Sequence, residues 1–320
     1  MSRLQLKLIS CVGVRYDLPL LRPFIHHYRD LGVAPAAMHF LLNGGGSEDA
    51  AIGAAQAILR EEGVAEPVVW TEAYTSDRMW AQRRALQSRV AGAQDWVISA
   101  DVDEFHEYPA DLADLLRHCD RQGVNCVQGV FIDRVAADGR LISLSHGDSP
   151  WQTYPVQAEI MCALARTGAH HDWYGTVKVM AIKGDLLPSR GGHHPLGGQS
   201  RAPAYLFGRP LGSFPLIDRP WLRFSIPCRV HHFKWTDTLI PSLQTRLATP
   251  GVSRAGAEYG AKILAHLEQT HAFDLHCFPR RRPTPFDRLP WRLRVHLIRR
   301  LAPTLRAGRR VRARLAVGQR

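Results

Sequence analysis

The first 125 residues alternate between short apolar runs and segments whose apolar residues recur every three or four positions. Short apolar runs bounded by turn residues predict strands, here at residues 4–14, 36–43, 67–73 and 96–100. The helical spacing predicts helices at 18–32, about 47–62, 77–93 and 109–123. Strand and helix thus alternate four times, which is typical of an α/β fold with a parallel sheet and helices on both faces.

Polar residues follow each predicted strand. They are Tyr16 and Asp17, then 43–49, 71–77 and 101–107. Ligands of such sheets bind beyond the carboxyl ends of the strands, so we expect these residues to meet at one rim. Ser47 and Asp77 are the expected N-caps of the second and third helices.

The pattern changes after Asn125. Residues 125–144 predict two strands joined by a turn at 137–140, and further strands are expected at 178–182 and 229–235. Helices are expected between 237 and 271. We read this half as an elaboration of the same sheet, so that residues 1–278 form one domain.

The positive charge is concentrated at the end of the chain. The net charge is +12, but 279–320 holds 14 arginines and one acid, so the preceding residues are close to neutral. No apolar run is long enough to cross a membrane, and the start lacks a secretory pattern. Six scattered cysteines predict neither a zinc site nor a disulfide framework, which fits a reducing, cytoplasmic setting.

The stretch WVISADVDEFHEYP places Asp101, Asp103 and Glu104 directly after an apolar strand. Carboxylates at this density are costly to desolvate unless a cation compensates them. In an extended segment Asp101 and Asp103 point the same way, so both reach one hard divalent ion, Mn²⁺ or Mg²⁺. The alternative is a solvated acidic turn that binds no metal and precedes the helix that begins at Pro109.

The same stretch resembles the DxDEF signature of GT-A glycosyltransferases in the family 2-like and family 92-like groups. Three further segments resemble the family in the same order: PLLRPFIHHYRDLGVAPAAMHFLLNGGGSED, VFIDRVAADGRL, and VHHFKW followed by a helix with Arg246. Together they span residues 5–250. The resemblance implies a GT-A fold, a nucleotide-diphospho-sugar donor and a divalent metal.

Carried over position by position, the resemblance implies a role for several residues. Asp101 and Asp103 hold the metal, and Asp17 and Asp49 contact the nucleotide, although the family's glycine beside the second acid is absent here. Lys178 matches a family lysine near the diphosphate, or is an ordinary strand-edge lysine. A late histidine often completes the metal site in this fold.

Alternation along 229–235 puts His232 and Lys234 on one face, suited to a metal and its diphosphate. The alternative is that His232 is a structural histidine, with hydrogen bonds inside the protein and no bound metal. An inverting transfer needs a carboxylate base, for which Asp172 and Glu159 are the candidates, with Asp133 as a further choice.

The sequence therefore predicts a metal-dependent, inverting glycosyltransferase of surface polysaccharide or glycan synthesis, acting on a glycan or lipid-linked acceptor. A metal-dependent phosphoester hydrolase is the first alternative, but it usually needs a second ligand cluster. A nucleic-acid-binding protein driven by the basic tail is the second.

The Arg-rich tail, 279–320, alternates basic and apolar residues. It is either an amphipathic segment that contacts an anionic membrane surface or a disordered end. Nucleic acid is not the expected partner, since no segment before the tail matches a known nucleic-acid-binding module.

Overall fold

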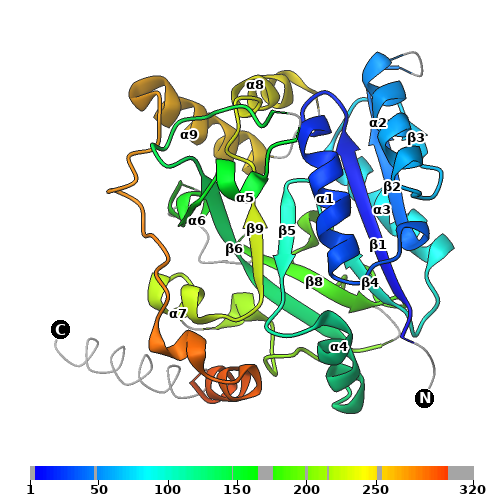
Figure 1. Cartoon of the computed structure of the whole chain (residues 1–320), viewed down its shortest axis with the longest axis vertical. Helices are drawn as coiled ribbons and strands as arrows, with labels where there is room; N and C mark the ends of the chain where they lie inside the picture. Colours follow the sequence, from blue (N-terminus) through cyan, green and yellow to red (C-terminus); the bar gives the residue numbers. More distant parts are fainter. Residues whose placement is uncertain are drawn as a thin grey trace.

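The computed structural model describes residues 4–46, 49–145, 147–164, 176–198, 201–214, 216–250 and 254–301. Within them nine strands form one sheet in the order β3-β2-β1-β4-β8-β6-β9-β5, and β7 pairs with β6 outside this path. Figure 1 shows the sheet running through the middle of the molecule, with helices packed against it.

The first half of the chain builds the parallel side of the sheet. Its strands are β1 (Leu6–Gly13), β2 (Met38–Asn43), β3 (Val68–Trp70) and β4 (Trp96–Ser99), and the pairs β1–β2, β2–β3 and β1–β4 are parallel. The helices between and after them are α1 (Leu18–Asp30), α2 (Ala50–Glu61), α3 (Ser76–Val90) and α4 (Leu112–Arg121). All four predicted strand–helix units are confirmed.

The second half builds the mixed side. Its strands are β5 (Glu104–Glu107), β6 (Cys126–Val135), β7 (Val156–Ala158), β8 (Val177–Lys183) and β9 (Arg229–His232). β6 runs parallel to β9, whereas β8 and β5 run antiparallel to their neighbours. The carboxyl ends of β4, β6 and β9 therefore lie at the same edge of the sheet as the amino ends of β5 and β8.

Further helices connect and cover these strands. They are α5 (Pro150–Thr153), α6 (Ile160–Leu164), α7 (Pro220–Ser225), α8 (Leu239–Ala248) and α9 (Arg254–Thr270), and residues 291–301 are also helical. In Figure 1, α8 and α9 lie at the top of the molecule, while α4, α7 and the orange-red helix 291–301 lie at the bottom.

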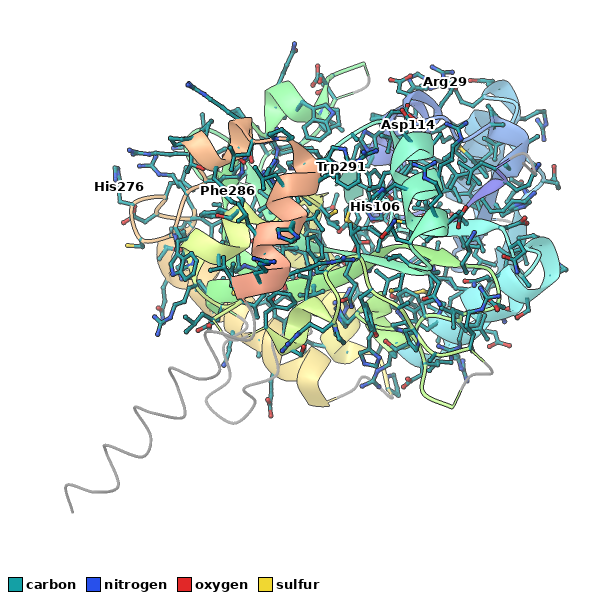
Figure 2. All side chains as sticks on the ribbon, turned by 90° about the horizontal axis from the view of Figure 1, so that it is seen from below. Arg29, His106, Asp114, His276, Phe286 and Trp291 are labelled. Carbon is teal, nitrogen blue, oxygen red and sulfur yellow. The ribbon has the colours of Figure 1, made fainter. Side chains whose placement is uncertain are left out.

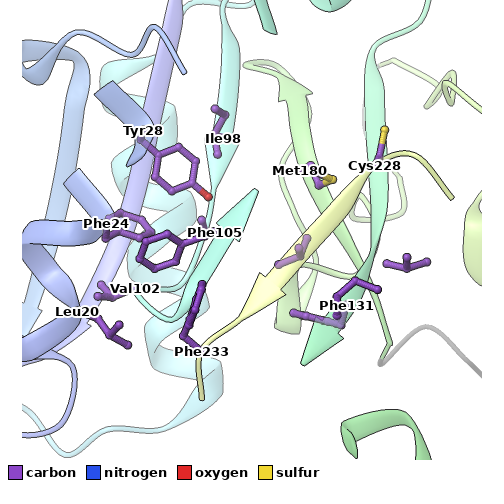
Figure 3. Close-up of a cluster of buried hydrophobic side chains, with 14 of the residues drawn as sticks. Leu20, Phe24, Tyr28, Ile98, Val102, Phe105, Phe131, Met180, Cys228 and Phe233 are labelled. Atoms are coloured by element: carbon purple, nitrogen blue, oxygen red, sulfur yellow. The ribbon is translucent and has the colours of Figure 1, made fainter. Parts of the chain in front are cut away.

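The core forms on both faces of the sheet, because strand residues alternate between them. Leu8 and Val12 of β1 pack in the larger cluster with residues of α1, α2 and α4. Ile9 and Cys11 face the smaller cluster with Met79 and Trp80 of α3. Figure 3 shows the larger cluster, where Phe24 and Tyr28 lie beside Phe105. These observations confirm a mixed α/β fold with helices on both faces.

Three local predictions were wrong or untested. Residues 137–140 do turn, but the following segment does not pair with β6; Ile142 instead bridges Thr236, because β7 and β9 already pair with the last residues of β6. Thr75, not Asp77, accepts a hydrogen bond at the start of α3. Ser47 lies outside the described residues, and Asp49 caps α2.

The first part of the Arg-rich tail is docked on the body. Arg281 donates a backbone hydrogen bond to Gln157, and Val295 and Ile298 of helix 291–301 are buried in the larger cluster. Residues 302–320 lie outside the described residues. The domain boundary at 278 stays a prediction.

Candidate functional site

Three carboxylates meet where β4 ends and β5 begins. One carboxylate oxygen from each of Asp101, Asp103 and Glu104 lies within 4.8 Å of the others. Val102 is buried in the core, and the segment that carries the two aspartates is a turn instead of the expected extended segment, because the Glu104 backbone nitrogen donates a hydrogen bond of 2.9 Å to the Asp101 carbonyl. Asp101 and Asp103 keep 35% and 24% of their side chains exposed, whereas Glu104 is buried, so solvent reaches the group from the aspartate side.

Two buried cations hold Asp101 and Glu104. Arg83 Nη1 lies 2.6 Å from one oxygen of Asp101, and Lys178 Nζ lies 3.2 Å from the other. Lys178 also lies 2.7 Å from Glu104. Burial by itself raises the pKa of Asp101, but Lys178 and Arg83 outweigh it and hold that pKa well below its usual range. Asp101 is therefore ionised at neutral pH.

Glu104 responds differently to the same neighbours. Burial, together with Asp101 and Asp103, raises the pKa of Glu104 to about 7, although Lys178 opposes the shift. Its second oxygen accepts a hydrogen bond from the backbone nitrogen of Asp101 at 3.1 Å. Glu104 thus fixes the turn that presents the two aspartates.

His232 links Asp103 to a fourth acid, the buried Asp133. Its Nε2 lies 3.4 Å from Asp103, and its Nδ1 lies 3.2 Å from Asp133. Burial alone would lower the pKa of His232, but the two carboxylates raise it to about 9. Asp133 also accepts hydrogen bonds from Trp235 Nε1 at 2.9 Å and the backbone nitrogen of Met161 at 2.7 Å. These contacts fix the imidazole in place.

A further group of charges surrounds Asp103. Asp17 accepts a hydrogen bond from the Gly13 backbone at 2.8 Å, and burial and the charge of Asp103 raise its pKa to about 7. Burial and the charge of Arg246 lower the pKa of Lys234 to about 8, while Asp103 opposes that shift. Arg246 belongs to α8, which a hydrogen bond of 2.9 Å between Tyr16 and Thr245 ties to the end of β1.

The structure therefore brings together six of the residues singled out in the sequence: Asp17, Asp101, Asp103, Lys178, His232 and Lys234. Lys178 is buried on an interior strand, which is not the position of an ordinary edge lysine. Which of the six bind a ligand stays a prediction.

The other three have different partners or lie outside the described residues. Asp49 accepts hydrogen bonds from the backbone nitrogens of Gly45 and Ala51, both at 3.0 Å, as the cap of α2. Glu159 is buried, with an oxygen 2.6 Å from Arg223 Nε. Asp172 lies outside the described residues, so the structure does not place it.

Sequence reasoning missed Arg83. It is fully buried on α3, where its guanidinium passes 4.7 Å from the centre of the Trp80 ring and binds Asp101. The sequence held a signal, because Arg83 lies three residues from both Trp80 and Leu86 on the apolar side of the predicted helix. A cation at an apolar position predicts a buried acid nearby.

The donor set suits a hard divalent cation. Carboxylate oxygens are the preferred ligands of Mg²⁺ and Mn²⁺, and the two partly exposed aspartates offer them toward solvent. Lys178 and His232 contact the same carboxylates, so a bound ion would share them with these cations. The group is therefore an acidic triad able to bind a divalent ion.

Comparisons with known proteins do not assign the chain to a family. No family model matches, and no curated protein matches. A crystal structure of residues 1–349 of S. aureus TarS superimposes with a TM-score of 0.29 and 11% identity, over 86% of this chain and 75% of the other. A longer TarS structure gives a TM-score of 0.31 and 10% identity, over 84% of this chain and 43% of that one. Similarity at this level carries no functional argument.

In the part of the chain that is described, no helix is long and apolar enough to span a membrane.

Proposed function

We propose that the protein is a glycosyltransferase that moves a sugar from a nucleotide-diphospho-sugar to an acceptor hydroxyl. The observation that supports this most strongly is the acidic triad at the edge where β4, β6 and β9 end, facing basic groups from β8, β9 and the segment after it. Acids that bind a metal and cations that bind phosphate are the two requirements of a diphosphate site. The GT-A assignment, made from sequence resemblance, fits this arrangement.

In this proposal Asp101 and Asp103 hold the Mn²⁺ or Mg²⁺ ion, which acts as a Lewis acid toward the diphosphate leaving group. Arg83 and Lys178 keep Asp101 ionised and oriented. Lys234 and Arg246 provide positive charge near Asp103 for the donor phosphates, and Asp17 lies beside them for the nucleoside. The surrounding contacts hold these groups before substrate arrives, which is what catalysis by preorganised charge requires.

The acceptor and the base are assigned from the sequence. Transfer with inversion needs a carboxylate that takes the acceptor proton, and Asp172 remains the candidate from sequence. Glu159 is less suited, because its carboxylate is buried against Arg223. The acceptor, a glycan or a lipid-linked glycan of surface polysaccharide synthesis, rests on the sequence resemblance alone.

A metal-dependent phosphoester hydrolase remains the alternative. Such enzymes commonly use two metal ions, which need more ligands than one triad supplies. Among the described residues, one group of three or more potential metal ligands is found. The transferase is therefore favoured.

The decisive test is nucleotide binding with and without metal. We expect UDP, GDP, ADP or CDP to raise the melting temperature of the full chain only when Mn²⁺ is present. At a hundredfold excess over Kd the gain in unfolding free energy is about 2.7 kcal/mol. Asp103→Asn should abolish the metal-dependent gain, while Asp114→Asn, which changes an exposed acid on α4, should keep it.

Turnover provides the second readout. With the donor identified by this panel, Asp103→Asn should lower kcat/KM at least about 100-fold, as expected when a group that stabilises developing charge is lost. Nucleotide affinity that is unchanged by Mn²⁺ would contradict the proposal, as would release of phosphate from simple phosphoesters without sugar transfer.

A further inference from the structure

The outer side of helix 291–301 exposes large apolar residues. Its inner side is formed by Arg294, Val295 and Ile298, which are buried against the body. Leu293 and Leu301 have 42% and 40% of their surface exposed, although they are large apolar residues. Together with the half-buried Leu297 they recur every four residues, so the three leucines form one stripe along the helix.

The neighbouring helix α7 carries a further exposed apolar residue. Trp221 of α7 is 53% exposed, which is the largest exposure of any large apolar residue among those described. Arg294 donates a hydrogen bond of 3.4 Å to the carbonyl of Ser225, one helical turn from Trp221, so α7 packs beside helix 291–301. Figure 1 shows the two helices next to each other at the bottom of the molecule.

Positive charge borders the leucines. Arg292, Arg299 and Arg300 are exposed on helix 291–301, and Arg219 is exposed just before Trp221. The ring of His118 on α4 lies 5.1 Å from that of Trp291, and burial together with Arg292, Arg121 and Arg299 lowers its pKa. Figure 2 views this end of the molecule and shows Trp291 and α4 on it. The sequence beyond 301 adds six more arginines.

We propose that this surface, which we call the basal face, docks on an anionic lipid bilayer; it comprises Arg219, Trp221, Arg292, Leu293, Leu297, Arg299, Arg300 and Leu301. Exposed leucine and tryptophan beside arginine is the composition of interfacial membrane segments, because apolar groups enter the acyl boundary while guanidinium groups bind lipid phosphates. Excess positive charge favours a bilayer over a second copy of the chain, since two such faces would repel each other.

The position of the basal face defines how the docked protein is oriented. It lies near the amino ends of β6 and β9, where Arg299 Nε donates a hydrogen bond to the Leu206 carbonyl. The acidic triad lies near Asp133, seven residues along β6, or about 23 Å away at about 3.3 Å per residue. Docking therefore tethers the protein and leaves the triad on the water side of the membrane.

This inference is independent of the chemistry proposed above, so failure of the Mn²⁺ test would leave it standing. The first experiment is sedimentation of the full chain with vesicles of phosphatidylcholine, with or without phosphatidylglycerol. We expect binding only to the anionic vesicles, and weaker binding as salt increases.

Substitutions distinguish vesicle binding by the basal face from vesicle binding by the arginines that follow it in the sequence. Leu293→Ser/Leu301→Ser should weaken vesicle binding by roughly tenfold or more, because two leucines no longer leave water on docking. Arg292→Gln should weaken it about fivefold. Val69→Ser and Arg60→Gln, which change exposed residues of β3 and α2, are the matched controls and should bind as the unchanged chain does.

Fluorescence of Trp221 tests insertion without depending on the stability of the leucine variant. Brominated lipids should quench part of the emission of the full chain, and Trp221→Phe should remove that part. Absence of binding to anionic vesicles would overturn the proposal. Equal binding by the leucine variant, or a dimer that these substitutions dissociate, would overturn it too.

Discussion

The two ends of β5 and β9 carry opposite charge patterns. At one end Glu104 pairs across the strands with His232, beside Asp101 and Asp103. At the other end Glu107 pairs with Arg229, and the C-terminal segment adds Arg281, Arg294 and Asp287. The first end is rich in carboxylates that solvent reaches, while the second is rich in guanidinium groups.

The C-terminal segment of the chain covers the second end. One oxygen of Asp287 lies 2.9 Å from Arg229, 2.9 Å from Arg281 and 3.1 Å from Arg294, so a single acid joins the C-terminal segment to the sheet. The Nε atoms of these three arginines are buried without a hydrogen-bond partner. Charges enclosed in this way pair with one another inside the junction, whereas partly exposed acids such as Asp103 remain accessible to a ligand.

The largest expected effect on stability comes from Lys178→Met, which leaves Asp101 and Glu104 without their shared cation. Removing one partner of a buried ion pair costs about 3–5 kcal/mol of unfolding free energy, measured by urea denaturation. Lys183→Met on the same strand is the control, because its partner Asp120 is 40% exposed and is solvated when left alone. Equal losses for the two variants would show that the acidic end is not specially dependent on its cations.

Asp287→Asn should have the next largest effect. It keeps the size of the side chain but leaves three guanidinium groups without their common acid, and we expect a loss of about 2–3 kcal/mol of unfolding free energy. Asp274→Asn, at an exposed turn, should cost less than about 0.5 kcal/mol. A variant of Asp287 as stable as that control would mean that the junction does not depend on this acid.

The smallest effect concerns pH. Burial lowers the pKa of His27 to about 4, and its Nε2 donates a hydrogen bond to the His106 carbonyl. Between pH 6.5 and 4 the unfolded chain binds a proton here and the folded chain does not, so stability falls as pH falls through this range. Between pH 7.5 and 5 we expect this histidine to account for about 1–2 kcal/mol.

His27→Gln should remove that part of the pH dependence in urea titrations, and His276→Gln, at an exposed position, should not. An unchanged slope in the His27 variant would assign the acid sensitivity to other groups. The His27 ring lies among the rings of Tyr28, Phe105 and Trp151.

Much of the fold could be predicted from sequence, because the repeated strand–helix pattern is local. Leu20, Phe24 and Tyr28 recur at helical spacing and do pack on the sheet. The return from the turn at 137–140 could not be predicted, since its pairing with Thr236 depends on which edges of β6 are already occupied. The docking of residues 279–301 depends on Asp287 meeting Arg229, 58 residues earlier in the chain.

For the candidate site, the sequence by itself determined the acids: Asp101, Asp103 and Glu104 follow one strand and stay together in any structure that keeps it. Only the tertiary structure decided how they are compensated. Arg83 comes from helix α3, and Lys178 comes from strand β8, which lies 77 residues from Asp101 in the sequence. Spacing along a chain determines which groups are neighbours in sequence, but the pairing of buried charges depends on strands and helices that meet only after folding.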